Sequence, residues 1–123
     1  MKIKRGKVRV INLTRGETLL KEAEVAGTFF RRLKGLLGRG RLPEDCGMLL
    51  IPCRGVHTVG IPFPLDVAFV DKKNRICFLQ EALPPCRLIP PVRGAFFVLE
   101  APAGTFRRKQ ARVGDEIEIK PLE

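Results

Sequence analysis

Residues 65–81 read LDVAFVDKKNRICFLQE, and this stretch decides the fold class. Two runs rich in β-branched and aromatic residues, 65–70 and 75–81, flank the tetrapeptide DKKN at residues 71–74. Such residues favour strands, whereas Asp and Asn favour the tight turn between them. The stretch therefore predicts a β-hairpin.

Similar short apolar runs extend outward from this hairpin in both directions. They are residues 8–13, 19–25, 47–51, 96–100 and 116–119, and they are separated by glycine, proline and polar residues. Short strands joined by turns are typical of small barrels and sandwiches.

Residues 28–37 break this pattern. Their apolar residues recur at helical spacing, and the opposite face carries Arg31, Arg32 and Lys34. We therefore predict a mainly β (α+β) fold, a small barrel-like or sandwich domain of about seven strands with one amphipathic helix. Residues 1–123 are expected to form a single domain, because this length suits one hydrophobic core.

The positive charge is concentrated in the first third of the chain. The whole chain has a formal net charge of +10, and residues 1–41 contain 12 Lys or Arg but only 3 acidic residues. The candidate anion-binding residues are Arg31, Arg32, Lys34 and Arg39. Such a face is either a solvated surface or a binding surface for an anionic partner. All 8 aromatic residues are Phe, most of them in predicted core runs, so we expect at most weak nucleic-acid binding.

No stretch approaches the roughly 18 consecutive apolar residues that a membrane span requires. The basic N-terminus is followed by alternating charged and apolar residues rather than by the apolar region of a signal peptide. We therefore expect a cytoplasmic protein with no membrane partner.

The residue types that are missing exclude several chemistries. The chain has no Ser, Tyr or Trp and one His, which excludes a Ser-His-Asp triad and a zinc site with two His ligands. Its four cysteines form no C-x-x-C pair, and glycine-rich nucleotide-binding motifs are absent. We expect no cofactor and no structural metal of these types.

One group of side chains could take part in catalysis or ligand binding, namely Cys53, His57, Thr58 and Asp66. A Cys–His pair can form a thiolate nucleophile or bind a soft metal, and a carboxylate can orient the imidazole. Alternatively, these residues only pack and hydrogen-bond within a loop rich in Pro and Gly. We expect the Asp66 carboxylate to lie near residues 53–60 and to accept hydrogen bonds from His57 or from the amides there. Glu100, at the end of an apolar run, is a further candidate ligand-binding residue.

Six motifs occur in a characteristic order along the chain. They are GLLGR at 35–39, GMLL at 47–50, CRGVHT at 53–58, PLDVAFVD at 64–71, VLEAPAG at 98–104 and VGD at 113–115. Together they resemble the DUF192 family, also called UPF0127, over residues 8–119. The resemblance implies a compact, barrel-like, mainly β domain with a helix packed against it. It implies no activity and no catalytic residues.

Three functional hypotheses follow from the sequence. The first is a non-enzymatic small-ligand or protein-binding module that uses the loop at residues 53–66. The second is a thiol-dependent enzyme or a metal site at Cys53, His57 and Asp66. The third is a nucleic-acid accessory protein that uses the basic residues 1–41.

Overall fold

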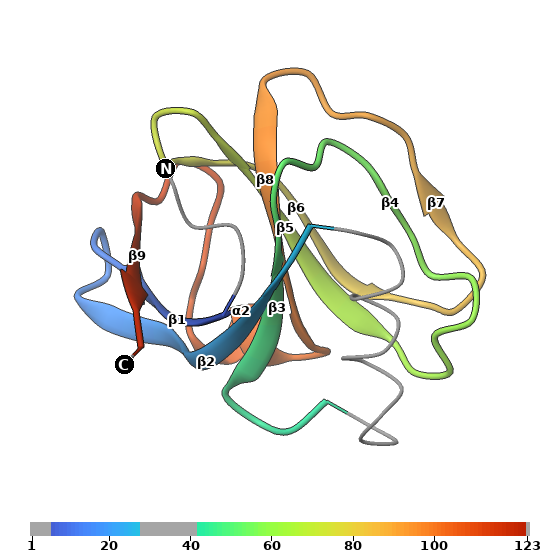
Figure 1. Cartoon of the computed structure of the whole chain (residues 1–123), viewed down its shortest axis with the longest axis horizontal. Coiled ribbons are helices and arrows are strands. Elements are labelled where there is room, and N and C mark those ends of the chain that lie inside the picture. The colour runs from blue at the N-terminus through green and yellow to red at the C-terminus, as the bar shows by residue number, and fades with distance from the viewer. Residues whose placement is uncertain (1–5, 28–41, 123) are drawn as a thin grey trace.

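Seven strands form one curled sheet in the computed structural model, which describes residues 6–27 and 42–122 (Figure 1). The strand order is β6-β5-β8-β3-β2-β1-β9. These strands are β1 (Gly6–Asn12), β2 (Glu17–Ala26), β3 (Cys46–Leu50), β5 (Leu65–Asp71), β6 (Ile76–Leu83), β8 (Ala95–Pro102) and β9 (Ile117–Pro121). The pair β2–β3 is parallel, and the other neighbouring strands of this sheet are antiparallel.

The two end strands of the sheet approach each other, which gives the fold its barrel-like shape. Just before β6 and β9 begin, Arg75 and Glu116 form an isolated antiparallel bridge. The amide of Ile117 donates to the Asn74 carbonyl at 2.7 Å, and the amide of Ile76 donates to the Asp115 carbonyl at 2.9 Å. The mainly β, barrel-like fold predicted from the sequence is therefore confirmed.

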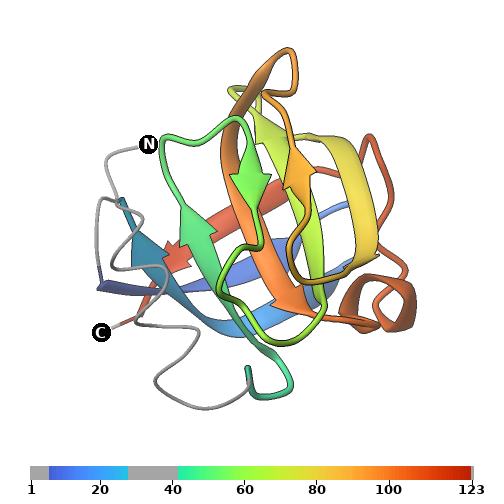
Figure 2. The same cartoon turned by 90° about the vertical axis from the view of Figure 1, so that its right-hand side faces the viewer.

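A second, smaller sheet consists of β4 (Val56–His57) and β7 (Leu88–Ile89), which pair antiparallel. Figure 2 shows these two short strands in front of β5 and β8. Val56 is buried in the hydrophobic cluster on this side of the large sheet, and Ile89 packs against that cluster. The sequence did not predict β4 or β7, because runs of two residues carry no periodic signal.

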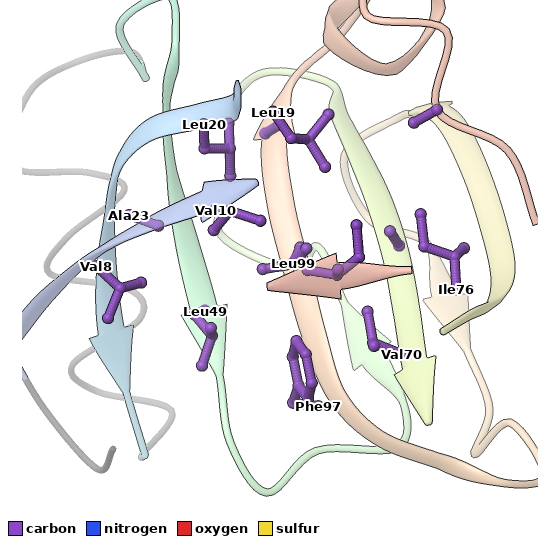
Figure 3. Close-up of a cluster of buried hydrophobic side chains, with 14 of the residues drawn as sticks. Val8, Val10, Leu19, Leu20, Ala23, Leu49, Val70, Ile76, Phe97 and Leu99 are labelled. Atoms are coloured by element: carbon purple, nitrogen blue, oxygen red, sulfur yellow. The ribbon is translucent and has the colours of Figure 1, made fainter. Parts of the chain in front are cut away.

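Because side chains alternate along a strand, each face of the large sheet has its own hydrophobic cluster. The first cluster lies inside the curl and includes Val10, Leu20, Phe97 and Leu99 (Figure 3). The second cluster includes Met48, Val67, Phe69 and Val98 and lies on the side of β4 and β7. Residues 65–70 of β5 contribute to both faces and are all buried, which explains their nearly continuous apolar character.

A polar cluster of Asn12, Arg15 and Asp115, the Asp115 cluster, fixes the place where the sheet closes. The buried Asp115 carboxylate accepts hydrogen bonds from Asn12 Nδ2 at 2.8 Å and from the Arg112 amide at 2.9 Å. Arg15 donates to both oxygens through two nitrogens, at 3.1 and 3.2 Å. Burial raises the pKa of the Asp115 carboxyl, but the bonds from Asn12, Arg112 and Arg15 outweigh burial, so its pKa lies below the usual value.

The amphipathic helix predicted at residues 28–37 lies outside the described residues. A four-residue helix that the sequence did not predict, α2 (Thr105–Arg108), follows β8 and buries Thr105 and Phe106. Within the described part of the chain, no helix has the length and apolar character needed to cross a membrane.

Candidate functional site

An open groove of about 730 Å³ lies where three segments of the chain meet. Pro52 and Arg54 form one wall, residues 71–73 of the β5–β6 turn form the second, and residues 94–96 at the start of β8 form the third. We call this the cationic groove. Each segment lies at least 17 positions from the next in the sequence (residue 54 to 71, and 73 to 94), so only the fold brings them together.

A β-bulge places Phe96 in the groove. Val70 of β5 pairs with Phe97, but the next residue, Asp71, pairs with Ala95, so Phe96 is an extra residue on β8. A bulge of this kind bends a strand and redirects the side chain of the extra residue. Phe96 is consequently half-buried: it packs against the first hydrophobic cluster and also lines the groove.

Backbone contacts hold the wall that contains Arg54. The amide of Cys53 donates to the Phe96 carbonyl at 2.9 Å, and the Arg54 carbonyl accepts from the Val92 amide at 2.7 Å. The next residue must be glycine, since a Cβ atom at Gly55 would lie 2.9 Å from the Ile89 carbonyl oxygen. The position of the Arg54 backbone is therefore fixed by the strand and loop beside it.

The turn that forms the second wall is held by its own carboxylate. Asp71 Oδ1 accepts hydrogen bonds from the amides of Lys73 and Arg75, at 2.9 and 3.0 Å. Asn74 adopts a left-handed conformation with φ of 63°, as expected at a tight turn. Asp71 thus stabilises the backbone that carries Lys72 and Lys73.

The groove has an excess of positive charge. Arg54, Lys72 and Lys73 are exposed, and none of them forms an ion pair with a carboxylate in the described part of the chain. Lys72 Nζ lies over the Phe96 ring, 5.8 Å from its centroid. Three cations beside an aromatic ring suit an anionic ligand, because a groove concentrates the field of the charges that line it.

The predicted candidates Cys53, His57 and Thr58 lie on one continuous segment, and none of the three lines the groove. The Cys53 thiol donates to the Gly55 carbonyl at 3.0 Å, and His57 lies on β4 opposite Leu88. Thr58 is fully buried; its hydroxyl donates to the Pro84 carbonyl at 2.7 Å and accepts from the Arg87 amide at 2.9 Å. Thr58 therefore connects two loops, and its hydroxyl is occupied by internal contacts.

The position predicted for the Asp66 carboxylate is wrong. Its oxygens accept hydrogen bonds from the Ala82 amide at 2.8 Å and from the Phe106 amide at 3.0 Å, not from residues 53–60. The reason is the pairing register of β5 with β8. Asp66 lies opposite Ala101, a member of the first cluster, so its side chain faces the inside of the curl. The carboxylate is fully buried and links β6 and α2 to β5.

Glu100 lies on the other face of the sheet. It is fully buried on β8, where it pairs with Met48 and Val67, both members of the second cluster. The two predicted carboxylates, Asp66 and Glu100, are thus separated by the sheet itself.

No group of three or more His, Cys, Asp or Glu side chains in residues 6–27 and 42–122 is arranged to hold a metal ion. The predicted anion-binding residues Arg31, Arg32, Lys34 and Arg39 lie outside the described residues. Sequence reasoning recognised residues 71–74 as a turn but missed its lysines as site residues. The same holds for Arg54 and Phe96, because a site assembled from three distant segments leaves no local motif.

The fold and the groove define a class: a small, barrel-like β domain built on one curled seven-stranded sheet, with a cationic surface groove. The chain belongs to the DUF192 family, described as "Uncharacterized ACR", whose model matches residues 10–119. The family resemblance inferred from the six motifs is therefore confirmed.

Relatives in sequence and structure agree with this assignment. The chain is 28% identical to a UPF0127 protein of Thermococcus sibiricus, with 89% of this chain and 73% of the relative covered. A solved protein of unknown function from Novosphingobium aromaticivorans superimposes with a TM-score of 0.75 at 26% identity, covering 91% of this chain and 83% of that one. A Sinorhizobium meliloti structure, described as a proposed transcription regulator, gives 0.72 at 28% identity, covering 97% and 98%.

Proposed function

We propose that this protein is a non-enzymatic binding module whose ligand is a small anionic molecule held in the cationic groove. The observation that carries the proposal is the set of three exposed cations, Arg54, Lys72 and Lys73, that converge on one groove without ion-pair partners among the described residues. The proposal uses the start of the 53–66 loop rather than Asp66, which faces the inside of the curl.

Size and rigidity support a small ligand. The groove volume of about 730 Å³ falls within the range of small-molecule sites, about 300–1,000 Å³. Its walls are fixed before a ligand arrives by the Cys53–Phe96 and Arg54–Val92 backbone bonds and by the Asp71 turn. A preformed site loses less conformational entropy on binding than a flexible one.

Calorimetric titration with inorganic pyrophosphate tests the proposal. We expect binding at low ionic strength that weakens as salt is added, because the cations are exposed and therefore screened. Arg54→Gln and Lys73→Gln should each weaken binding. Arg9→Gln and Lys21→Gln are matched controls, since these residues are also exposed and form no ion pair within residues 6–27 and 42–122, but lie on β1 and β2, outside the groove.

Two results would contradict the proposal. Absence of pyrophosphate binding at low salt would remove it outright. Equal weakening by the groove variants and the control variants would show that net charge, rather than the groove, attracts the anion.

The other hypotheses from the sequence stay predictions. One is the thiol-dependent enzyme or metal site at Cys53, His57 and Asp66, although Asp66 faces the inside of the curl and these three described residues form no metal-binding group. The others are a nucleic-acid accessory role for residues 1–41 and a cytoplasmic location. A specific role for Cys53 would need its thiol to be released from the Gly55 carbonyl that it contacts.

A further inference from the structure

We infer that the ligand of the cationic groove carries a planar aromatic ring that stacks on Phe96 while its phosphate faces Arg54, Lys72 and Lys73. The chemical class is that of a nucleoside monophosphate. This inference rests on the proposed function and adds the identity of the uncharged part of the ligand.

The Phe96 ring is held firmly on the side that faces the protein. It packs against the first hydrophobic cluster and makes an edge-to-face contact with Phe97, with a centroid distance of 6.5 Å and an interplanar angle of 81°. Phe96 is the bulged residue of β8, and its own backbone carbonyl accepts a hydrogen bond from the Cys53 amide. This bond anchors the backbone that carries the ring. The ring is therefore a fixed platform.

Lys72, an exposed side chain that also lines the groove, contacts the Phe96 ring. Lys72 Nζ lies over this ring, 5.8 Å from its centroid. A lysine on a four-carbon stem can move from the ring to a phosphate without any change in the backbone. Arrival of a ligand would thus exchange a cation–π contact for a stacking contact and an ion pair.

A binding site for a bare anion does not require an aromatic wall. Bases stack on aromatic side chains largely irrespective of their identity, and Phe96 is the one aromatic residue of the described chain that lines the groove. The groove combines a bulged, half-buried Phe with three cations that form no ion pair in the part of the chain the structure describes. This combination matches a ligand with a ring at one end and a phosphate at the other.

A comparison of two probes tests this inference. Ribose 5-phosphate and AMP share the sugar and the phosphate and differ in the adenine ring. By calorimetry at low ionic strength, AMP should bind about 5-fold or more tightly than ribose 5-phosphate, as stacking on one aromatic residue provides. Phe96→Leu should abolish this advantage and leave the affinity for ribose 5-phosphate unchanged.

The matched control is Phe78→Leu. Phe78 is also a partly exposed Phe, on β6, but it contacts Phe69 and does not line the groove, so both affinities should remain as in the wild type. A second measurement avoids any loss of folding in the Phe96 variant. In the wild-type protein, the ring-proton resonances of Phe96 should shift upfield on addition of AMP but not of ribose 5-phosphate.

Each outcome decides between the inference and the proposed function. Equal binding of the two probes would overturn the ring inference and leave an anion-binding groove. An AMP advantage that survives Phe96→Leu would place the stacking contact elsewhere and overturn it as well. Absence of binding by both probes and by pyrophosphate would overturn the proposed function itself.

Discussion

The Asp115 cluster and the cationic groove use charge in opposite ways. In the Asp115 cluster, one buried carboxylate accepts bonds from Asn12, from the Arg112 amide and from both nitrogens that Arg15 contributes. In the groove, three cations surround one carboxylate, and Asp71 Oδ1 already accepts from two amides of its own turn.

This difference separates charges that hold the fold from charges that are available to a partner. Buried charges are tolerated when they are paired and hydrogen-bonded, and removing one member leaves the others without partners. Exposed cations without ion pairs contribute little to folding and remain free to attract anions. Substitutions in the Asp115 cluster should therefore lower stability far more than substitutions in the groove.

The largest effect is expected from Asp115→Ala. The change leaves Asn12, Arg15 and the Arg112 amide without their acceptor, which should lower the free energy of unfolding by about 2–4 kcal/mol. Urea denaturation followed by circular dichroism measures this. Glu118→Ala is the control, because its ion pair with Lys120 is solvent-exposed and should contribute less than about 1 kcal/mol. A loss no larger than in the control would show that the cluster does not hold the closure of the sheet.

Much of the fold could be predicted from the sequence, because the strands carry strong local signals. Residues 65–81 form the predicted hairpin, since β5 ends at Asp71, the first residue of the DKKN turn, and β6 begins at Ile76 and pairs antiparallel with β5. The short strands β4 and β7 could not be predicted, because they are formed by pairing between distant loops. The helix α2 could not be predicted either, because four residues are too few to show a helical pattern.

The site was harder to predict for a physical reason. Asp66 stood out because a carboxylate in an apolar run needs partners, and it does have them. The direction of its side chain, however, is set by the register with Ala101 on β8, which the sequence does not reveal. Phe96 looked like a core residue, and only a bulge in the pairing of β5 with β8 turns it toward the groove.

A second, smaller effect is expected from Asp66→Asn, which tests a buried carboxylate held by amides alone. An Asn side chain has one acceptor oxygen, so it can serve the Ala82 amide or the Phe106 amide but not both. One buried donor without a partner should cost about 1–3 kcal/mol in the free energy of unfolding. Glu24→Gln on β2 is the exposed control, for which a change within about 0.5 kcal/mol is expected. No loss would mean that these two bonds do not stabilise the link between β5, β6 and α2.

Protonation of Asp115 in acid should lower the free energy of unfolding less than Asp115→Ala does, because a protonated carboxyl still accepts some hydrogen bonds. Its pKa in the folded state lies below the usual value, so the folded protein binds fewer protons than the unfolded chain in acid. The stabilisation is therefore fully present above the unfolded-state pKa and is lost as the pH falls through the folded-state pKa. Urea titrations at a series of acidic pH values should show that the free energy of unfolding falls less steeply with decreasing pH in Asp115→Asn than in the wild type. Identical slopes would contradict this role of Asp115.

The smallest effect is expected from the double variant Arg54→Gln and Lys73→Gln in the groove. Neither cation has an ion-pair partner among the described residues, so its removal breaks no salt bridge with them, and the free energy of unfolding should change by no more than about 0.5 kcal/mol per site. The change should be toward higher stability, since a chain with a net charge of +10 repels itself, and the gain should shrink as salt screens that repulsion. Lys72 is left in place because its contact with Phe96 contributes to stability by itself. Denaturation at low and high ionic strength measures both expectations. A loss of more than about 1 kcal/mol would show that these cations hold the walls of the groove, and the contrast between the two regions would no longer stand.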